Sequence, residues 1–574
     1  MTDLREHLKQ RILEVVGEDN ADLVQLQPPR QRSHGDISLG CFLLAKKLNE
    51  SPQSLATRIS DALGRDEMIE TALASGPFVN FRFRRAELAR TAIEGILLQH
   101  PPFGPMPASG QCVVIDFSSP NIAKPFHIGH MRSTVIGAAL RRLHQHLGAK
   151  VHGVNHIGDW GMPFARMMTA YMRWGDEESL GAQPMRYMFS LYIRYGKEAK
   201  DDPSLDEEAA RHFKNLESEA NNQERELWEF LRDESLKAFQ GPYDRLGVTF
   251  DHITGESFYE SRISEAMQKV VDAGILTRSE GADVVDLEDQ GISVPCILRK
   301  SDGTTLYHTR DLAAAFYRQE TYHPDRILYV VGSEQRLHFQ QLRAVLSKMG
   351  ADLADKIEHV PFGLVLAKNT DTNKWEKFAS RGGNAIFMDE VLDEAVAQVR
   401  RVIEEKNADL HDKDRIAEQI GVSAIIFNDL KNGRIKDVKF DWDKMLSFEG
   451  ETGPYVQYAC ARLSSILRKA DAPKDLDALL EGIDYSLLTD AEAVLLSMHE
   501  FGPSLERAAQ QSEPSIITNL MIQVAGEIHS YLHEHHVLRA ELSTRRARLA
   551  LVAAARRLLE TGLGLIGVAA PHEM

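Results

Sequence analysis

Cysteine is scarce in this sequence. Its 574 residues include only four cysteines, which lie far apart at Cys41, Cys112, Cys296 and Cys460. A disulfide-stabilised domain needs several cysteines in a short stretch, and a cysteine-based zinc site needs them at short, paired spacings. The scarcity argues against both kinds of site. We therefore expect no metal site built by the protein, and we expect a reducing compartment, the cytoplasm.

Long hydrophobic runs are also missing. The best candidate, residues 549–555, is far shorter than the ~20 apolar residues that cross a bilayer, and arginines flank it. The first residues, MTDLREHLKQRILEVVG, are amphipathic but contain Asp3, Glu6 and Glu14. Transit peptides are poor in acidic residues, and signal peptides need an apolar centre. We therefore interpret this stretch as a helix of a folded domain, and we expect no membrane partner.

An excess of positive charge is missing as well. The chain has 67 Lys+Arg against 84 Asp+Glu, a formal net charge of −17. This balance argues against coating of nucleic acid through a general positive field, but local basic patches could still bind RNA phosphates. The hydrophobic and charged fractions, 43% and 26%, are those of an ordinary globular protein. The length exceeds what one hydrophobic core supports and predicts about two to four domains.

The patterns along the chain divide it into three segments. Residues 1–108 alternate amphipathic helices with short strands, and we predict that the proline-rich stretch PPFGPMPASG at 101–110 is a linker. Residues 411–574 repeat apolar residues at helical spacing almost throughout, which predicts a helical bundle.

The middle segment, residues 109–410, has a different pattern. Apolar, strand-like runs alternate with helical patterns, which predicts a parallel α/β sheet. The runs are QCVVIDFSS (111–119), HGVNHIG (152–158), DVVDL (283–287) and RILYVVG (326–332). Residues near 195–240 are densely charged and helical, so we expect a solvated insertion there.

The strongest local signal is SSPNIAKPFHIGHMRSTVIGAALRRLHQHLG at 118–148. It follows the strand-like run 113–117, so its loop is expected at the carboxyl edge of the sheet, where open α/β folds bind ligands. His127 and His130 would lie at the N-terminus of the next helix, which favours phosphate. Their imidazoles could donate hydrogen bonds to a polyphosphate, and Gly129 leaves room for a nucleobase. The alternative is that both are surface histidines on a loop.

The sequence around these histidines resembles the HIGH signature of class I aminoacyl-tRNA synthetases. SPNIAKPFHIGHMRST and the later NHIGDWG (155–161) are similar to the arginyl branch of that class. Further matches to this branch follow one another in the expected order: SHGD (33–36), GPFVNF (76–81), LYHTRDLA (306–313), YVVGSEQRLHF (329–339), FDWDKMLSFEGETGPYVQYACARL (440–463) and GLGLIGVAAPHEM (562–574).

The resemblance implies a multidomain α/β and α fold. It implies a small α/β tRNA-binding domain at 1–108, a Rossmann-like parallel-sheet catalytic domain with a helical insertion at 109–410, and a helical-bundle anticodon-binding domain of the DALR type at 411–574. It also implies the activity. L-arginine would be activated with ATP, accompanied by Mg²⁺, to arginyl-adenylate and transferred to the 2′-hydroxyl of the terminal adenosine of tRNA(Arg). A monomer is implied, as is a need for bound tRNA before activation becomes efficient.

The resemblance also implies a second ATP-binding loop, written KMSKS in class I enzymes. Its counterpart is KFASRGGN at 377–384, where Lys377 takes the first lysine position and Ser380 replaces the second. Loss of that cation would weaken stabilisation of the transition-state charge. The family resemblance suggests Lys124 as its replacement; the alternative is that Lys124 is a solvated loop charge. The implied ATP contacts are His127, Gly129, His130, Lys377 and Ser380, and the implied catalytic residues are His127, His130, Lys124 and Lys377.

An arginine-binding pocket must present acceptors to a planar cation with five N–H donors. The resemblance implies Glu256, Tyr307 and Asp311 as guanidinium contacts, and Asn121 and Gln335 as α-amino contacts, with His130 near the carboxylate. The four-residue spacing of Tyr307 and Asp311 would place both on one face of a helix. Each residue also has an ordinary interpretation. Asp311 could cap a helix that starts at Leu312, Tyr307 could pack in the core, and Glu256 could be a turn residue.

Several weaker signals remain. Five arginines near the C-terminus could face tRNA phosphates or form a solvated helix face with neighbouring glutamates: Arg545, Arg546, Arg548, Arg556 and Arg557. GLGLIG (562–567) matches a dinucleotide-binding pattern by letter but follows a helix, so we predict a helix end and turn. HSYLHEHH (529–536) lacks zinc-protease spacing and is interpreted as a solvated helix face.

The sequence leaves two rival functions open. A relative that forms arginyl-adenylate for an acceptor other than tRNA would keep the catalytic residues but would not need both outer domains. A catalytically silent RNA-binding protein would not need the histidine pair or the arginine pocket.

Overall fold

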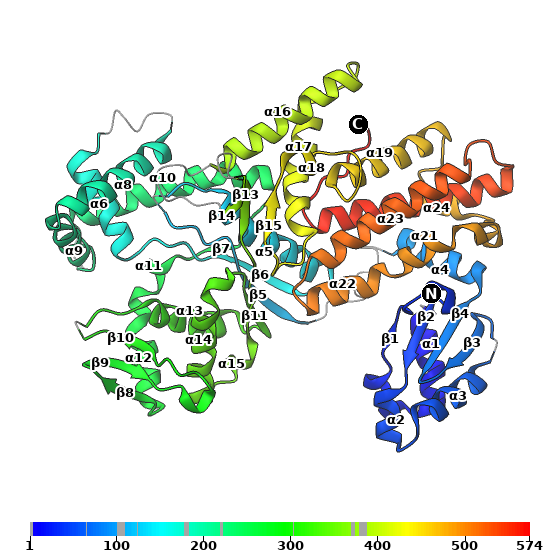
Figure 1. The fold of residues 1–574 in the computed structure, drawn as a ribbon, viewed down its shortest axis with the longest axis horizontal. Helices are drawn as coiled ribbons and strands as arrows, with labels where there is room; N and C mark the ends of the chain where they lie inside the picture. Colours follow the sequence, from blue (N-terminus) through cyan, green and yellow to red (C-terminus); the bar gives the residue numbers. More distant parts are fainter. Residues whose placement is uncertain are drawn as a thin grey trace.

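The computed structural model describes residues 4–64, 66–99, 110–122, 124–176, 183–218, 222–301, 303–368, 373–377 and 387–574. Figure 1 shows an N-terminal α/β domain beside a helical body, which the C-terminal helices form. A central sheet flanked by helices follows next to the helical body, and a smaller antiparallel sheet lies on the side away from the N-terminal domain. Within the described ranges, no helix has the length and hydropathy of a membrane span. The predicted linker lies outside the described residues except for Gly110.

The N-terminal domain is a four-stranded antiparallel sheet with helices against it. Its strand order is β1-β2-β4-β3, and its strands are β1 (Leu26–Gln27), β2 (Ile37–Gly40), β3 (Ile69–Ser75) and β4 (Phe78–Phe83). The helices are α1 (Leu4–Val16), α2 (Phe42–Leu48), α3 (Pro52–Leu63) and α4 (Arg85–Leu98). Leu4, Leu8 and Ile12 recur at helical spacing and are all fully buried, so α1 turns one face into the core of the domain, where it contacts α3. The alternation of helices and strands predicted here is confirmed.

The central sheet has five parallel strands in the order β12-β11-β5-β6-β7. They are β5 (Cys112–Asp116), β6 (Lys150–Asn155), β7 (His252–Ile253), β11 (Arg326–Tyr329) and β12 (Ile357–His359). Val113, Val114 and Ile115 are fully buried because helices cover both faces of a parallel sheet. The Rossmann-like class of the catalytic domain is confirmed, and β5, β6 and β11 all end at one edge.

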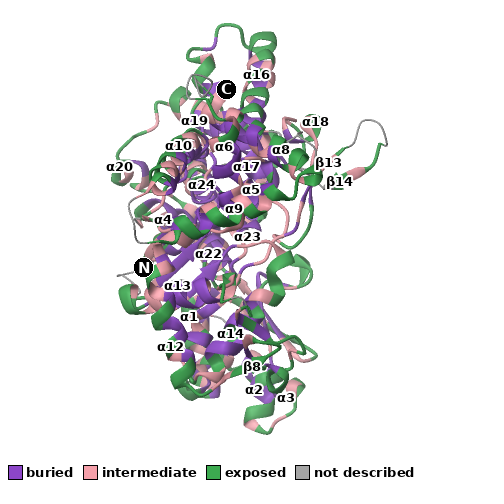
Figure 2. Ribbon diagram, turned by 90° about the vertical axis from the view of Figure 1, so that its left-hand side faces the viewer, coloured by how far each residue is buried: buried purple, intermediate pink, exposed green. Residues whose placement is uncertain are grey.

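Helices surround this sheet. They are α5 (Ile128–His146), α6 (Met162–Trp174), α11 (Glu256–Tyr259), α12 (Ile263–Asp272), α13 (Tyr307–Tyr322), α14 (Arg336–Lys348) and α15 (Leu353–Lys356). Helix α5 approaches β5 very closely, since a Cβ atom at Gly137 would lie 2.2 Å from the Cβ of Phe117. Figure 2 shows buried residues concentrated where α5, α17 and α24 meet.

The charged stretch after α6 is helical, as predicted, but it is not simply solvated. It forms α8 (Pro184–Asp201), α9 (Ser204–Leu216) and α10 (Gln223–Leu246). Leu205, Phe213 and Trp228 are buried, and the Trp228 indole donates a hydrogen bond to the Asp159 carbonyl at 2.8 Å. Most charges lie on the outer faces of these amphipathic helices, and their apolar faces pack inward, so the insertion is part of the packed domain.

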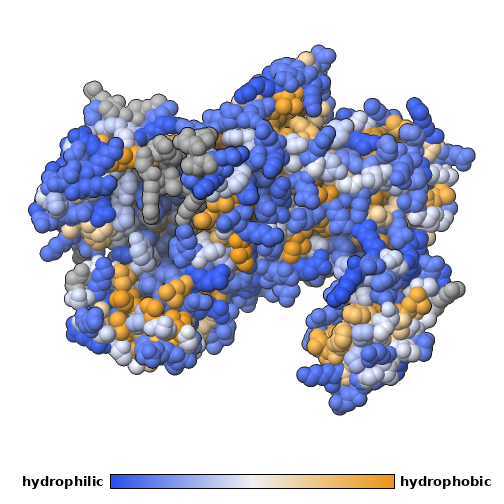
Figure 3. Space-filling view, viewed as in Figure 1, coloured by the Kyte–Doolittle hydropathy of each residue, from blue (hydrophilic) through white to orange (hydrophobic). Residues whose placement is uncertain are grey.

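One predicted strand belongs to another sheet. DVVDL does form β9 (Ala282–Val285), but β9 pairs antiparallel with β8 (Leu276–Ser279) and β10 (Cys296–Arg299). The prediction of a parallel strand is wrong here because only Glu280 and Gly281 connect β8 to β9, both with positive φ. A two-residue turn of this kind joins antiparallel strands. On the face shown in Figure 3, apolar side chains gather over the sheet of β8, β9 and β10 and over α12–α14.

The third predicted segment is mainly helical but includes one strand. β15 (Val438–Phe440) pairs parallel with β13 (Val365–Lys368), which pairs antiparallel with β14 (Trp375–Lys377). The remaining elements of this segment are helices: α17 (Lys413–Leu430), α18 (Trp442–Met445), α19 (Gly453–Lys469), α20 (Leu476–Leu480), α21 (Glu492–His499), α22 (Phe501–Gln510), α23 (Ser515–Glu534) and α24 (Leu542–Leu565). The helix before them, α16 (Met388–Lys406), belongs to the second predicted segment. GLGLIG forms the end of α24 and a turn at Gly567 (φ +79°), as predicted.

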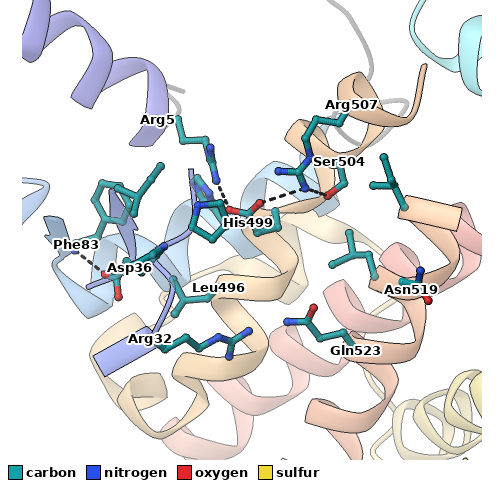
Figure 4. Close-up of a pocket in the computed structure, with 16 residues that line it drawn as sticks. Arg5, Arg32, Asp36, Phe83, Leu496, His499, Ser504, Arg507, Asn519 and Gln523 are labelled. Atoms are coloured by element: carbon teal, nitrogen blue, oxygen red, sulfur yellow. Dashed lines mark hydrogen bonds and ion pairs between the residues drawn. The ribbon is translucent and has the colours of Figure 1, made fainter. Parts of the chain in front are cut away.

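The N-terminal domain docks on the helical body through ion pairs. Arg5 bonds to Glu500, Arg32 lies 2.9 Å from Glu527, and Arg85 lies 3.0 Å from Glu492. Arg5 and Arg32 line an interdomain cavity of about 330 Å³ together with side chains of α21–α23 (Figure 4). These contacts fix how the two outer parts of the molecule lie relative to one another.

Candidate active site

The loop after β5 leads directly into α5, and the two predicted histidines cap that helix. The Gly129 N–H donates to His127 Nδ1 at 3.0 Å, and the His127 N–H donates to His130 Nδ1 at 3.2 Å. The two ring centroids are 4.0 Å apart. The placement of both histidines at a helix N-terminus is therefore confirmed. The ordinary interpretation as loop surface residues fails because both rings are part of the cap.

This capping arrangement defines the chemistry of the two rings. Because each Nδ1 accepts a backbone hydrogen bond, each neutral ring has its proton on Nε2. Burial, with Lys124 adding, lowers the pKa of His127. Burial, with His127 and Lys124 adding, lowers the pKa of His130 well below its ordinary value. Both imidazoles are thus neutral at pH 7 and offer Nε2–H donors beside a helix N-terminus, where phosphate is favoured.

A cavity of about 590 Å³ opens at this edge of the sheet. It gathers predicted residues that are widely separated along the chain: Asn121, Gly129, His130, Glu256, Tyr307, Asp311 and Gln335. Lys124 lines a smaller adjoining pocket with Asn121, Glu256 and Tyr307, and its ammonium lies 5.5 Å from the Tyr192 ring centre. Burial lowers the pKa of Lys124. The two predicted subsites therefore share one cleft.

Two predicted residues cannot be placed in the same way. Lys377 is the last residue of β14, and its side chain lies outside the described part of the molecule. Ser380 lies wholly outside the described residues. Their roles stay predictions.

Helix α13 explains the position of Tyr307 and Asp311. The helix begins at Tyr307, so the two residues are one turn apart on its first turns, as the spacing predicted. Asp311 is therefore not the cap of a helix that starts at Leu312. Tyr307 is 56% exposed, so its role is not core packing.

Glu256 has the most unusual environment in the cavity. It starts α11, and its Oε2 atom is buried without a hydrogen-bond partner among the described residues. Burial raises the pKa of Glu256 to about 8, against the lowering effect of Arg310 and with a further rise from Asp311. A buried carboxylate oxygen without a donor costs free energy until a cation or donor reaches it.

The neighbouring carboxylates all have partners. Asp116 accepts from Arg318 at 2.7 Å and from Ser119 at 2.9 Å. Asp159 accepts from the N–H and hydroxyl of Ser257 at 2.9 and 2.6 Å. Asp311 is hydrogen-bonded to His338. Among the described carboxylates Asp116, Asp159, Glu256 and Asp311, Glu256 alone has a buried oxygen left open.

Several lining residues were not predicted from the sequence. Asp116, His156 and His338 line the same cavity. A signal was available for two of them, since Asp116 ends β5 and His156 directly follows β6, and ligands bind at the carboxyl ends of parallel strands. His338 lies within the YVVGSEQRLHF run, but nothing local marked it.

Magnesium was expected together with ATP. Searching the described residues finds no group of three or more His, Cys, Asp or Glu that could hold a metal ion. The donors at the N-terminus of α5, the Nε2–H groups of two neutral imidazoles, suit phosphate oxygens instead. We therefore treat magnesium as part of the nucleotide substrate.

Comparisons with known proteins agree with this site. Residues 92–442 match the family model of the class I (R) tRNA synthetase catalytic domain. Residues 2–83 match that of the arginyl tRNA synthetase N-terminal domain, and residues 456–574 match that of the DALR anticodon-binding domain. The parallel sheet with His127 and His130 at its carboxyl edge thus defines a class I aminoacyl-tRNA synthetase.

Full-length relatives narrow the assignment. The chain is 42% identical over 568 residues to an arginine–tRNA ligase of an Exiguobacterium species, covering 98% of each chain. It is 39% identical over 580 residues to that of Halothermothrix orenii, covering 100% of each. The solved arginyl-tRNA synthetase of Thermus thermophilus superposes with a TM-score of 0.85 at 27% identity over 100% of both chains. That of Plasmodium falciparum, with a TM-score of 0.79 and 21% identity over 100% of both chains, shares the fold. The chain belongs to the arginyl-tRNA synthetase family.

Proposed function

We propose that this chain is an arginine–tRNA ligase, which forms arginyl-adenylate from L-arginine and ATP and then esterifies tRNA(Arg). The observation that carries the proposal is the open Oε2 of Glu256, which lies in one cavity with Asp311 and Tyr307. These groups are acceptors for a flat cation with several N–H donors.

The same acceptors account for selectivity for arginine over lysine and citrulline. Lysine is a point cation that cannot reach two carboxylates in a planar fork, and citrulline lacks the charge. Either substitute would leave Glu256 or Asp311 incompletely paired, at a cost on the order of 1–3 kcal/mol, or more for a charged group. Selection of this strength needs no separate editing site.

The same cavity also offers partners for the α-amino and carboxylate groups of arginine. Asn121 and Gln335 line it with His130, and we assign the first two to the α-amino group. Gly158 leaves space for the Asn121 side chain, since a Cβ there would lie 2.1 Å from Asn121 Oδ1. The substrate carboxylate would then point toward the phosphate end of the cavity.

The proposed first step is an in-line displacement. The arginine carboxylate is ionised at pH 7, so its oxygen attacks the α-phosphorus of ATP without a general base, and pyrophosphate leaves. The Nε2–H groups of His127 and His130 would donate to phosphate oxygens, and Lys124 would supply positive charge there. Lys377 and Ser380 are proposed as further ATP contacts. Magnesium would neutralise part of the triphosphate charge.

In the proposed second step, the 2′-hydroxyl of the terminal adenosine of tRNA attacks the adenylate carbonyl and AMP leaves. The helical body offers a place for the other end of the tRNA. A cavity of about 650 Å³ there is lined by Arg462, Arg468, Lys469, Arg539 and the half-exposed Tyr458. Guanidinium and ammonium groups bind phosphates, and an exposed tyrosine can stack on a base, so we propose that the anticodon loop binds there.

The five arginines near the C-terminus are engaged within the chain. Arg545, Arg546 and Arg557 donate to backbone carbonyls, the last two to Glu481 and Leu97. Arg548 donates to the His536 carbonyl and Arg556 to the Ser464 hydroxyl. These contacts tie α24 to its neighbours, so we do not assign the five arginines to tRNA phosphates.

We also propose that the enzyme acts as a monomer, as the family resemblance implied, and that it works in the cytoplasm, as the scarcity of cysteine suggested. Light scattering of the purified protein would test the first point, with the mass of one 64.4 kDa chain expected. Cell fractionation would test the second.

Charging of bulk tRNA by the wild type and by His127→Ala tests the function. We expect wild type to esterify tRNA with arginine alone among the amino acids, and the variant to be slower by about 10²–10³-fold, because a phosphate-binding donor is lost. Arginine-dependent ATP–pyrophosphate exchange without tRNA charging would favour an adenylate-forming enzyme with another acceptor. Neither exchange nor charging would favour a silent RNA-binding protein.

A further inference from the structure

Arg318 is a fully buried arginine beneath the floor of the substrate cavity. It belongs to α13, and its side chain is 0% exposed. Nη2 donates to Asp116 Oδ2 at 2.7 Å and lies 3.3 Å from His156 Nδ1. Its guanidinium carbon lies 5.1 Å from the centre of the Tyr329 ring. Since Asp116 ends β5, His156 follows β6 and Tyr329 ends β11, one side chain contacts the carboxyl ends of three adjacent strands.

The helix that contains Arg318 also presents the proposed guanidinium contacts. Tyr307 and Asp311 lie on its first turns, and Arg318 follows Asp311 by seven residues, about two turns or ~10 Å. Residues seven apart lie on the same face of a helix. The proposed guanidinium contacts and Arg318 thus lie on the same face of α13, and Arg318 attaches this face to the ends of the strands.

Fold stability does not explain this residue. Burying a guanidinium–carboxylate pair costs desolvation free energy that its attraction often fails to recover, and apolar side chains of similar volume are often as stable or better. Here the Nε and Nη1 groups of Arg318 are also buried without hydrogen-bond partners in the described structure. A role other than stabilising the fold must therefore explain why an arginine is buried at this position.

We propose that Arg318 is a positioning residue for arginine activation. It holds α13 at a fixed place against the ends of β5, β6 and β11, and so sets the separation between Asp311 and the phosphate end at His130. The inference rests on the proposed function, since the separation matters only if an arginine spans it. Misplacement of a bound substrate by about 1 Å can cost on the order of 10²-fold in rate.

The charge of Arg318 supports the same role. By pairing with Asp116, Arg318 offsets one of the carboxylates that line the cavity, so that Glu256 and Asp311 are left to accept from the substrate. Burial would raise the pKa of Asp311, but His338, His156 and Arg318 together hold it below its ordinary value. A neutral residue at 318 would thus both loosen α13 and weaken ionisation of Asp311.

The test compares Arg318→Met with Arg318→Lys in the full-length protein. The assay is ATP–pyrophosphate exchange with saturating tRNA, and the substrates are titrated separately. For Arg318→Met we expect the KM for arginine to rise at least tenfold and kcat to fall, with the KM for ATP within twofold of wild type. Arg318→Lys should recover part of kcat/KM for arginine, because an ammonium can pair with Asp116 but cannot also reach His156 and Tyr329.

Arg132→Met is the matched control. Arg132 is 1% exposed and pairs with Asp429 at 2.8 Å, so its loss also breaks a buried ion pair, but it does not line the substrate cavity. We expect this variant to lower the melting temperature without a selective change in the KM for arginine. A folded Arg318→Met protein with the wild-type KM for arginine would overturn the inference. The inference would also be overturned if the KM for arginine and the KM for ATP changed equally in each variant, in proportion to its loss of melting temperature. No arginine-dependent exchange by wild type would instead overturn the proposed function and, with it, this inference.

Discussion

His338 Nε2 is hydrogen-bonded to Asp311 Oδ2, and both side chains line the cavity at the carboxyl edge of the central sheet. The contact joins α14 to α13 and fixes one carboxylate oxygen of Asp311, which leaves the other for a substrate. His308 lies beside His338 with 4.3 Å between ring centres, and it is 3.0 Å from the Gln341 amide oxygen. Asp311 is thus oriented by a chain of side chains behind it.

This contact predicts the effect of removing His338. His338→Ala should raise the KM for arginine about 10- to 150-fold, because a hydrogen bond to a charged group contributes about 1.5–3 kcal/mol. His338→Gln retains a donor and should cost less. Steady-state exchange kinetics at fixed tRNA would measure both. An unchanged KM in the folded alanine variant would show that Asp311 is oriented without His338.

The pKa of Glu256 predicts a pH dependence of arginine binding. With a pKa raised to about 8, Glu256 is mostly protonated at pH 6 and becomes an anion as pH rises. A cation binds the anion, so the KM for arginine should fall as pH rises from 6 to 8, by up to about tenfold per unit. The charged groups that face Glu256 are Arg310 and Asp311 on α13, Asp159 and Glu260.

Calorimetry offers a second readout of the same effect. Arginine binding at pH 7 should release a proton, so its heat should depend on the ionisation enthalpy of the buffer. Glu256→Gln should bind more weakly and show neither the buffer effect nor the slope with pH. A flat KM between pH 6 and 8 in the wild type would contradict the assignment of Glu256.

A requirement for tRNA in the first step is the next prediction. ATP–pyrophosphate exchange should be low with arginine alone and should rise when tRNA(Arg) is added. tRNA whose terminal adenosine has been oxidised cannot accept arginine. It should stimulate exchange as much as intact tRNA, because the stimulation requires tRNA binding and not transfer of arginine. Equal exchange with and without tRNA would contradict this expectation.

Packing of α5 against β5 predicts a stability effect. Gly137→Ala would place a Cβ 2.2 Å from the Cβ of Phe117, and overpacking of this kind costs about 1–3 kcal/mol. Gly196→Ala in α8 is the control, since nothing lies within 4 Å of the new Cβ. It should gain about 0.5–1 kcal/mol from helix propensity. Thermal melts of the two variants should shift in opposite directions.

Local patterns predicted part of this site well. The cap formed by His127 and His130 and the pairing of Tyr307 with Asp311 depend on residues three or four apart, which one helix determines. The central strands were predictable because Val113, Val114 and Ile115 form an apolar run that only a sheet covered on both faces buries.

Contacts between distant segments were not predictable. Asp116 and Arg318 are 202 residues apart, and only the order of the strands brings them together. Nor did the spacing of DVVDL show that its strand pairs with a hairpin partner rather than with the central sheet. The arginines of α24 appeared free in the sequence because their acceptors lie in other parts of the chain. The predicted domain boundaries at 108 and 410 stay predictions.

The most direct measurement is a crystal structure with L-arginine and a non-hydrolysable ATP analogue. We expect the guanidinium within hydrogen-bond distance of Glu256 and Asp311, with the carboxylate toward the phosphates at His127 and His130. A guanidinium that contacts neither carboxylate, or a nucleotide bound away from the N-terminus of α5, would contradict the account.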